Sequence, residues 1–218
     1  MKTVLRICLM LSFLMAGFAV QRVFPEEKVI FCDNFKEIKD LASAGWQLKE
    51  GKGPTKWELT EEGLKITHCT VPYQGARIVK AIPAARKGYL EFDAKIGDAN
   101  NRHLSLQVYL FGQLTCFNGY GTRRINWNRY QGMPLQKHFD IQNNIEPDKW
   151  HKFRISFNAD EKTFEFFVDD MKDPVDVHTE VPFDPGNPEH LFVVIGDYAL
   201  CPGEVINYVN NVRFVETR

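Results

Sequence analysis

Residues 150–170, WHKFRISFNADEKTFEFFVDD, carry the clearest structural signal in this chain of 218 residues. Two runs rich in aromatic and β-branched residues, Trp150 to Phe157 and Thr163 to Val168, flank the polar segment from Asn158 to Lys162. Runs of this kind, separated by a short polar segment, predict two antiparallel strands joined by a turn. The stretch therefore predicts a strong β-hairpin.

Three further segments alternate between apolar and polar residues: 89–96, 103–110 and 138–142. Because successive side chains of a strand point to opposite faces, each segment predicts a strand with one buried and one polar face. The expected buried residues are Leu90, Phe92, Ala94 and Ile96 in the first, Leu104, Leu106, Val108 and Leu110 in the second, and Phe139 and Ile141 in the third. A hairpin at 57–66 and strands at 29–31, 76–82, 190–195 and 205–215 complete an all-β pattern.

One short helix is expected near the N-terminus of this pattern. Asn34 and Glu37 have the spacing of a capping box, and apolar residues recur at helical spacing over 35–41, before Gly45. No segment has the composition of an interdomain linker. The sequence therefore predicts a single domain over 20–218, built from two packed antiparallel sheets with one short N-terminal helix.

The first 19 residues have the pattern of a secretory signal peptide. Lys2 and Arg6 precede the apolar stretch 7–15, and Gly17 and Ala19 are the small residues that a signal peptidase requires. The stretch is shorter than the roughly 20 residues that a membrane-spanning helix needs. We therefore expect a secreted protein, extracellular or periplasmic, whose mature chain has no membrane span.

Four cysteines follow the predicted signal peptide: Cys32, Cys69, Cys116 and Cys201. An even number of cysteines in an exported chain predicts at least one disulfide, although the pairing stays open. No two of the four have Cys-x-x-Cys spacing, which argues against a zinc ribbon.

The balance of charges excludes one class of partner. The chain has 27 basic and 28 acidic residues, a formal net charge of -1. A nucleic-acid-binding domain is typically strongly basic, so no nucleic-acid partner is expected. The oligomeric state stays open.

The hairpin at 150–170 resembles the most recognisable hairpin of the concanavalin A-like lectin/glucanase superfamily, which includes laminin G-like domains. In that hairpin a Trp opens the first strand, and the second strand ends in Val-Asp-Gly or a similar sequence. The segments 57–66, 87–96 and 208–214 resemble other strands of the superfamily in the same order. The resemblance covers most of 29–216 and implies a jelly-roll sandwich with one concave sheet, which often binds glycans.

The superfamily also contains enzymes, and the sequence departs from them. Family-16 glycoside hydrolases resemble this chain at 88–95, but their catalytic strand carries Glu-x-Asp-x-x-Glu. Here Glu91 and Asp93 are followed by Ile96 near the place of the third acid, and residues 99–138 contain no Asp or Glu. A retaining glycosidase needs two carboxyl groups about 5–5.5 Å apart.

Lyases that resemble alginate lyases are the second enzymatic alternative. Their chemistry uses His and Tyr as base and acid, and residues of these types occur here at His103, Tyr109 and His138. The superfamily's Arg-x-Glu-Leu-Arg and Gln-Ile-His strings are absent. If the protein is a lyase, these three residues are the expected catalytic ones.

The polar residues of the alternating strands form the candidate ligand-binding groove. Polar side chains suit the hydroxyl groups of a sugar, and aromatic rings suit its C–H faces, whereas a merely solvated sheet face has more Lys, Glu and Thr. The expected ligand-binding residues are Glu91, Asp93, His103, Gln107, Tyr109, Asn126, Asn128, Tyr130, His138, Asp140 and Gln142.

These observations leave three functions open. The first is a secreted glycan-binding domain that recognises a polysaccharide on its concave sheet. The second is a polysaccharide lyase or glycoside hydrolase of the same fold, and the third is a structural or adhesion module that binds protein. No cofactor is expected, although the resemblance allows a structural Ca²⁺ held by Asp33 and the closing strand, where relatives often have Asp and this chain has Asn210 and Asn211.

Overall fold

The computed structural model describes residues 26–49, 55–69, 77–97, 104–118, 124–129, 137–140, 145–179, 184–199 and 204–218. Within these ranges, the backbone alone is described for 68–69, 104–105, 113–118, 124–129, 137–140, 197–199 and 204. The predicted signal peptide lies outside the described residues. No helix in the described ranges is long and apolar enough to cross a membrane.

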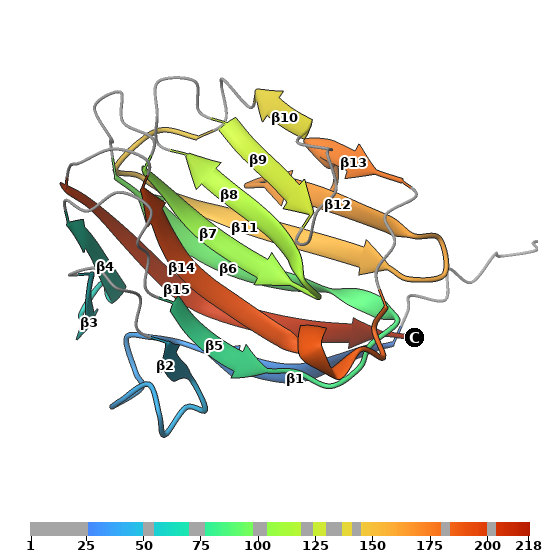
Figure 1. Ribbon diagram of the computed structural model, residues 1–218, viewed down its shortest axis with the longest axis horizontal. Helices are drawn as coiled ribbons and strands as arrows, with labels where there is room; N and C mark the ends of the chain where they lie inside the picture. The colour runs from blue at the N-terminus through green and yellow to red at the C-terminus, as the bar shows by residue number, and fades with distance from the viewer. Residues whose placement is uncertain are drawn as a thin grey trace, which may run out of the picture.

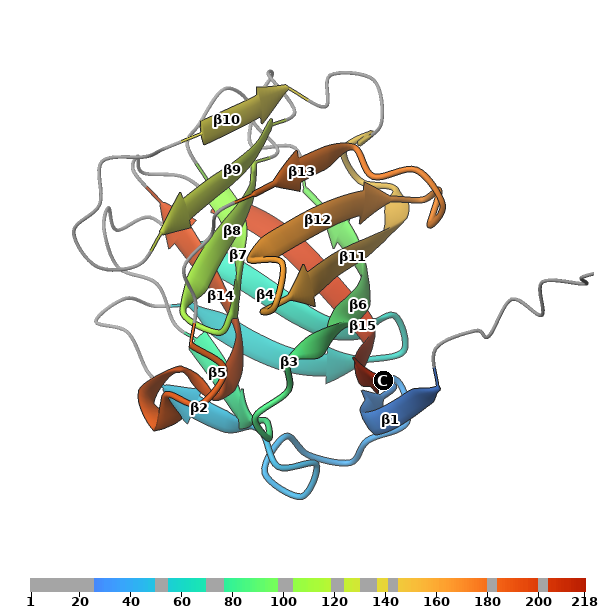
Figure 2. The same cartoon turned by 90° about the vertical axis from the view of Figure 1, so that its right-hand side faces the viewer.

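The described chain forms two antiparallel sheets that lie face to face (Figures 1 and 2). The eight-stranded sheet has the order β13 (Asp176–His178), β12 (Thr163–Val168), β11 (Trp150–Asn158), β6 (Lys87–Ile96), β15 (Glu204–Thr217), β4 (Gly63–Cys69) and β3 (Lys56–Thr60), with β1 (Glu27–Asp33) paired to β15. The seven-stranded sheet has the order β10 (Lys137–Asp140), β9 (Arg124–Arg129), β8 (Gln113–Asn118), β7 (Leu104–Leu110), β14 (Phe192–Ala199), β5 (Arg77–Ala81) and β2 (Gln47–Lys49). The predicted all-β architecture of two antiparallel sheets is confirmed.

The predicted hairpin at 150–170 is confirmed as β11 and β12. Phe157 pairs with Phe164, and Asn158 with Thr163, so the turn begins where the polar segment was expected. β11 also pairs along its whole length with β6. The hairpin therefore supplies two of the eight strands of the larger sheet, next to β6.

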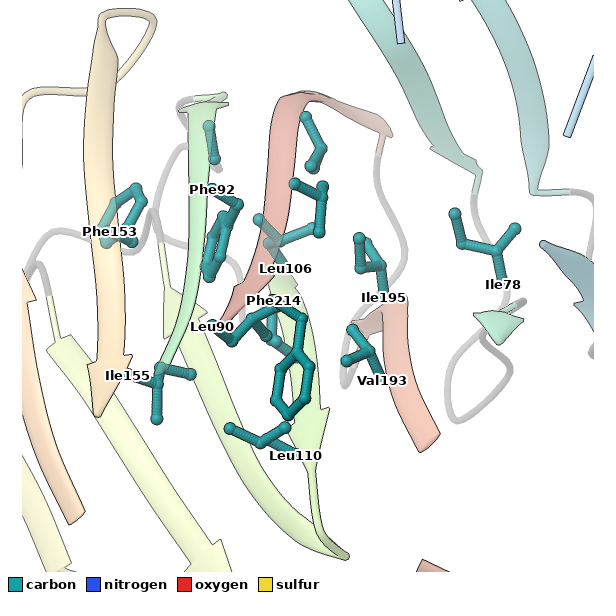
Figure 3. Packing of buried hydrophobic residues seen from close by; sticks show 14 of the residues in the cluster. Ile78, Leu90, Phe92, Leu106, Leu110, Phe153, Ile155, Val193, Ile195 and Phe214 are labelled. Carbon is teal, nitrogen blue, oxygen red and sulfur yellow. The ribbon is translucent and has the colours of Figure 1, made fainter. Parts of the chain in front are cut away.

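Alternation along the strands places one side of each sheet in a shared core (Figure 3). Leu90 and Phe92 of β6 face Leu106 and Leu110 of β7, and all four side chains are at most 1% exposed. Each fully buried side chain of this size stabilises the fold by about 1.5–3 kcal/mol relative to an exposed one. The alternation predicted for the first two segments is confirmed at these positions, while Phe139 has no described side chain and Ile141 lies outside the described residues.

Phenylalanine rings hold the two sheets together at the centre of the core. Phe214 of β15 stacks on Phe157 of β11, with ring centroids 5.8 Å apart and an interplanar angle of 6°. Phe111, in the turn after β7, contacts both rings, with its centroid 4.8 Å from that of Phe157. Aromatic contacts of this kind add about 0.5–1.5 kcal/mol beyond the area that they bury.

Strands that follow each other in the sequence often belong to different sheets. β6 lies in the eight-stranded sheet and β7 in the seven-stranded sheet, and the chain crosses again between β14 and β15. Their outer faces therefore lie on opposite sides of the sandwich.

The predicted N-terminal helix is wrong, because the described residues 34–45 form turns. The Asn34 side chain accepts a hydrogen bond from the backbone N–H of Lys36, two residues on, which makes a turn and not a capping box. The segment is instead held by tertiary contacts, with Phe35 and Trp46 each 1% exposed in the core. The apolar residues that recur at helical spacing therefore belong to a loop that packs on the core.

Phe214→Ala tests the importance of the central aromatic cluster. We expect a loss of about 3–5 kcal/mol in the free energy of unfolding, since the substitution leaves a cavity between the sheets. Val29→Ala is the control, because Val29 is 50% exposed and should change stability by no more than about 0.5 kcal/mol. Urea unfolding measures both, and similar midpoints for the two variants would contradict the assignment.

Candidate functional site

The structure separates the predicted groove residues into two groups. Glu91 and Asp93 lie on β6, in the eight-stranded sheet. The seven-stranded sheet carries Gln107, Tyr109, Asn126, Asn128, His138 and Asp140. The expectation that all share one face is therefore wrong for Glu91 and Asp93, because the chain changes sheet between β6 and β7. His103, Tyr130 and Gln142 lie outside the described residues.

Glu91 belongs to a network of ion pairs on the eight-stranded sheet. One carboxylate oxygen of Glu91 accepts hydrogen bonds from Nε and Nη2 of Arg154, at 3.0 and 2.6 Å, and Lys152 Nζ lies 3.6 Å from the other oxygen. The Arg154 guanidinium also lies over the ring of Tyr89, 4.3 Å from its centroid. Two cations thus neutralise a buried carboxylate, which would be costly to leave unpaired, and this arrangement does not suit an acid or nucleophile of a glycosidase.

The register of the seven-stranded sheet brings polar residues into one continuous row. Residues that pair directly across antiparallel strands lie on the same face of a sheet. Successive pairings join His138, Asn126, Cys116, Gln107, Gly196, Arg77 and Lys49, one from each strand. Gln107 alternates with the core residues Leu106 and Val108, so this row belongs to the outer face.

A second row runs beside the first on the same face. It contains Asn128, Leu114, Tyr109, Val194, Val79 and Gln47, from β9 to β2. The two rows together place five of the predicted site residues on one face: Gln107, Tyr109, Asn126, Asn128 and His138. Asp140 pairs with Arg124 of β9 farther along the same two strands.

A cavity of about 230 Å³ opens on this face over β5, β14 and β7, which lie side by side in Figure 1. Its apolar side is formed by Tyr109, Val79, Phe192 and Val194, and its polar side by Arg77, Lys49, Glu189 and His190, with Gly112 between them. The Tyr109 hydroxyl donates a hydrogen bond to Gln107 Oε1 at 3.2 Å, so the two rows are linked below the cavity. We call this the Tyr109 cavity.

A two-residue turn after β7 shapes one end of the Tyr109 cavity. Phe111 and Gly112 have φ values of 49° and 73°, as expected for a tight hairpin turn with a glycine in its second position. The turn directs Phe111 into the core and leaves room above Gly112 for the His190 ring, whose Cδ2 would lie 3.0 Å from a Cβ at that position. Any side chain at position 112 would therefore displace His190.

A second recess, of about 390 Å³, lies on the opposite side of the sandwich and includes Asp93 and Trp150. Its polar groups largely pair with one another. Asn211 Nδ2 donates to Asp93 Oδ2 at 2.6 Å, and His151 Nδ1 lies 2.8 Å from Asp169 Oδ2. The backbone N–H of Glu146 donates to His151 Nε2 at 2.9 Å, which leaves the imidazole proton on Nδ1 for Asp169. These bonds fasten the β11–β12 hairpin and favour a structural role for this recess.

Two of the three residues expected to be catalytic in a lyase lie far apart, and the third, His103, lies outside the described residues. Tyr109 on β7 and His138 on β10 are separated by two intervening strands, a backbone distance of about 14 Å at the usual strand spacing. A base and an acid that act on one sugar carbon must both reach it within hydrogen-bond distance. The described geometry therefore gives no support to a Tyr109–His138 acid/base pair.

The residues named for a calcium site do not fit that role together. Asp33 Oδ2 already accepts hydrogen bonds from Lys80 Nζ at 2.5 Å and from Trp46 Nε1 at 2.8 Å. The lysine ammonium supplies the positive charge that the carboxylate requires. Asn210 Oδ1 is buried without a hydrogen-bond partner among the described residues, but the described part of the chain contains no cluster of three acidic, His or Cys side chains for a metal.

Cys32 is an exposed free thiol and makes no disulfide. The side chains of Cys69, Cys116 and Cys201 lie outside the described residues, so a disulfide among these three stays a prediction.

Comparisons with solved structures identify the fold as the concanavalin A-like jelly roll. A sialidase matches with a TM-score of 0.65 at 14% identity, over 84% of this chain and 18% of the sialidase chain. A glycosyl hydrolase family protein from Mycobacterium fortuitum matches with a TM-score of 0.59 at 13% identity, over 86% of this chain and 99% of that protein. Lectin I-B4 from Griffonia simplicifolia has a TM-score of 0.55 at 13% identity, over 85% and 99% of the two chains. No family model matches the sequence, and no curated protein matches it.

Of the nine residues that line the Tyr109 cavity, the sequence predicted one, Tyr109, as a site residue. Arg77, Lys49 and Phe192 come from β5, β2 and β14, which are far from β7 in the sequence and meet it only through sheet pairing. The alternation of Arg77, Ile78 and Val79 was a usable signal, because Ile78 is fully buried and its neighbours face outward. β5 is too short for this alternation to be recognised in the sequence.

The Tyr89 hydroxyl gives the network on the eight-stranded sheet a testable pH dependence. Burial raises the pKa of Tyr89 above its ordinary value, and the charge of Arg213 opposes this rise. The folded protein therefore keeps the hydroxyl proton of Tyr89 at a pH of about 10, where an unfolded tyrosine loses it. This contribution to stability is complete below that pH and is lost as the pH rises through the folded-state pKa.

We accordingly expect Tyr89→Phe to unfold with a shallower loss of stability than the wild type as the pH rises above about 10. Urea unfolding over a series of alkaline pH values measures the difference. Parallel stability curves for the two proteins would show that Tyr89 does not titrate differently in the folded state.

Proposed function

We propose that this protein is a secreted glycan-binding domain that recognises a polysaccharide on the outer face of its seven-stranded sheet. The observation that carries the proposal is the Tyr109 cavity, which is lined by both aromatic and apolar side chains and polar and charged ones. Concave sites with a mostly apolar lining and a few convergent polar groups are typical of small-molecule binding.

The chemistry of the cavity suits a sugar. A pyranose ring has apolar C–H faces, which pack against an exposed ring such as Phe192, and hydroxyl groups at its edge, which need both donors and acceptors. Glu189 offers acceptor oxygens, while Arg77 and His190 offer N–H donors. The outer face of the seven-stranded sheet spans about 29 Å at the usual strand spacing, which is comparable to the length of a chain of several sugars.

The solved structures of the same fold support a carbohydrate partner. Their names include lectins, glycoside hydrolases, a sialidase and a transglycosylase. The predicted signal peptide at 1–19 supports a location outside the cytoplasm, extracellular or periplasmic, where polysaccharides are available as ligands.

Binding agrees with the described geometry better than hydrolysis does. Glu91 is neutralised by Arg154 and Lys152, and Asp93 lies on the opposite side of the sandwich from Tyr109. Among the residues lining the Tyr109 cavity, Glu189 is the one carboxylate. A glycosidase of either stereochemical class needs a pair of carboxyl groups across the scissile bond.

Removal of the apolar wall tests the proposed binding site. We expect Phe192→Ala to weaken polysaccharide binding by about tenfold, because aromatic side chains in a pocket supply much of the binding energy. Affinity electrophoresis against a panel of neutral and acidic polysaccharides gives the measurement. Tyr208→Ala is the matched control, since Tyr208 lies on the eight-stranded sheet, and Phe192 is 37% exposed, so its removal should leave the core intact.

The same panel separates the alternatives. Unsaturated products would identify a lyase, and released reducing ends without double bonds would identify a hydrolase. Wild-type protein that binds none of the polysaccharides would contradict the proposal and favour a structural or adhesion module that binds protein.

A further inference from the structure

The charges of the Tyr109 cavity are unbalanced. Arg77 and Lys49 are cationic, whereas Glu189 is the single carboxylate in the lining. None of these three makes an ion pair within the described part of the chain. The whole chain, by contrast, carries a net charge of -1. A recess with excess positive charge on a slightly acidic protein attracts anionic ligands.

Arg77 differs from the other arginines whose contacts are described. Arg86, Arg154 and Arg213 each contact a carboxylate, from Asp160, Glu91 and Glu27 respectively. Arg77 contacts the ring of Tyr109 instead, with its guanidinium carbon 4.8 Å from the ring centroid. Its N–H donors are therefore not committed to an acid within the described residues.

The contact with Tyr109 prepares Arg77 to bind an anion. A ring beneath the guanidinium restrains a long, flexible side chain without using its N–H donors. The five donors of a guanidinium form a planar fork that matches the two oxygens of a carboxylate. Because the side chain is already restrained, less entropy is lost when the ligand binds.

Neighbouring side chains add to the same preference. His190 Nδ1 lies 3.4 Å from Asn187 Nδ2, an amide nitrogen that donates, so the other ring nitrogen carries the proton in the neutral imidazole. Lys49 pairs with Arg77 across β2 and β5 and places a second cation on the row. The polar side of the cavity is thus rich in donors.

We propose that the glycan bound in the Tyr109 cavity is acidic, and that Arg77 binds the carboxylate of one of its sugars. The sugar ring then packs against Phe192, Tyr109 holds the Arg77 guanidinium in place, and Lys49 supplies further positive charge. This inference rests on the proposed glycan-binding function and adds the class of glycan.

Pairs of related polysaccharides that carry or lack the acidic group test the inference. We choose polygalacturonate with its methyl ester, hyaluronan with its carboxyl-reduced form, and a sialylated mucin with its desialylated form. Calorimetry or affinity electrophoresis compares each pair. We expect the wild-type protein to bind at least one acidic member about 10- to 100-fold more tightly than its neutral partner, the range typical of a hydrogen-bonded ion pair.

Variants of Arg77 then assign that difference to one side chain. Arg77→Gln should remove most of the preference, because the acidic member then loses the side chain that binds its carboxylate. Arg77→Lys should restore part of it, because the charge returns without the planar fork. Arg86→Gln is the matched control, since Arg86 is exposed and pairs only with Asp160 among the described residues.

The outcomes separate this inference from the proposed function. Equal binding of acidic and neutral members would overturn the inference and leave glycan binding intact. A preference that survives in Arg77→Gln, or that Arg86→Gln also loses, would overturn the role of Arg77. Failure to bind any member of any pair would overturn the inference and the proposed function together.

Discussion

Each strand of this protein can bury only one of its faces, because side chains alternate along a β-strand. The two sheets meet this constraint by packing their apolar faces together around Phe92, Phe157 and Phe214. The opposite face of each sheet is then left for polar residues, and both candidate recesses lie on those outer faces. The position of the site follows from the way in which the core is built.

The two outer faces use their charges differently. On the eight-stranded sheet, Glu91, Arg154 and Lys152 neutralise one another, and Asp93 is bound by Asn211. Such internal pairing compensates the buried charges and leaves few of their donors and acceptors for a ligand. On the seven-stranded sheet, Arg77 is held by an aromatic ring and keeps its donors. A charged side chain that has no ionic partner within the described structure is therefore the better candidate for binding a ligand.

The failure of the predicted helix at 34–45 and of the shared groove has a common cause. Local spacing of apolar residues shows which side chains are buried, and Phe35 is indeed buried. The spacing does not show which secondary structure contains these residues. Here they belong to a loop that is held by the contacts among Asp33, Trp46 and Lys80. In the same way, alternation placed Glu91 and Gln107 on polar faces correctly but could not show that these faces lie on opposite sides of the sandwich.

The sequence by itself determined the strands and their buried faces, because alternation is a local property of the chain. The hairpin at 150–170, the core residues of β6 and β7, and the all-β class with two antiparallel sheets were all predictable on that basis. Only the tertiary structure decided which strands are neighbours, because pairing joins segments that are distant in the sequence. Strand pairing places Arg77 over Tyr109 and Asp93 on the other side of the sandwich. The side-chain pattern does not predict this, because strands pair through backbone hydrogen bonds, which are the same for every residue type.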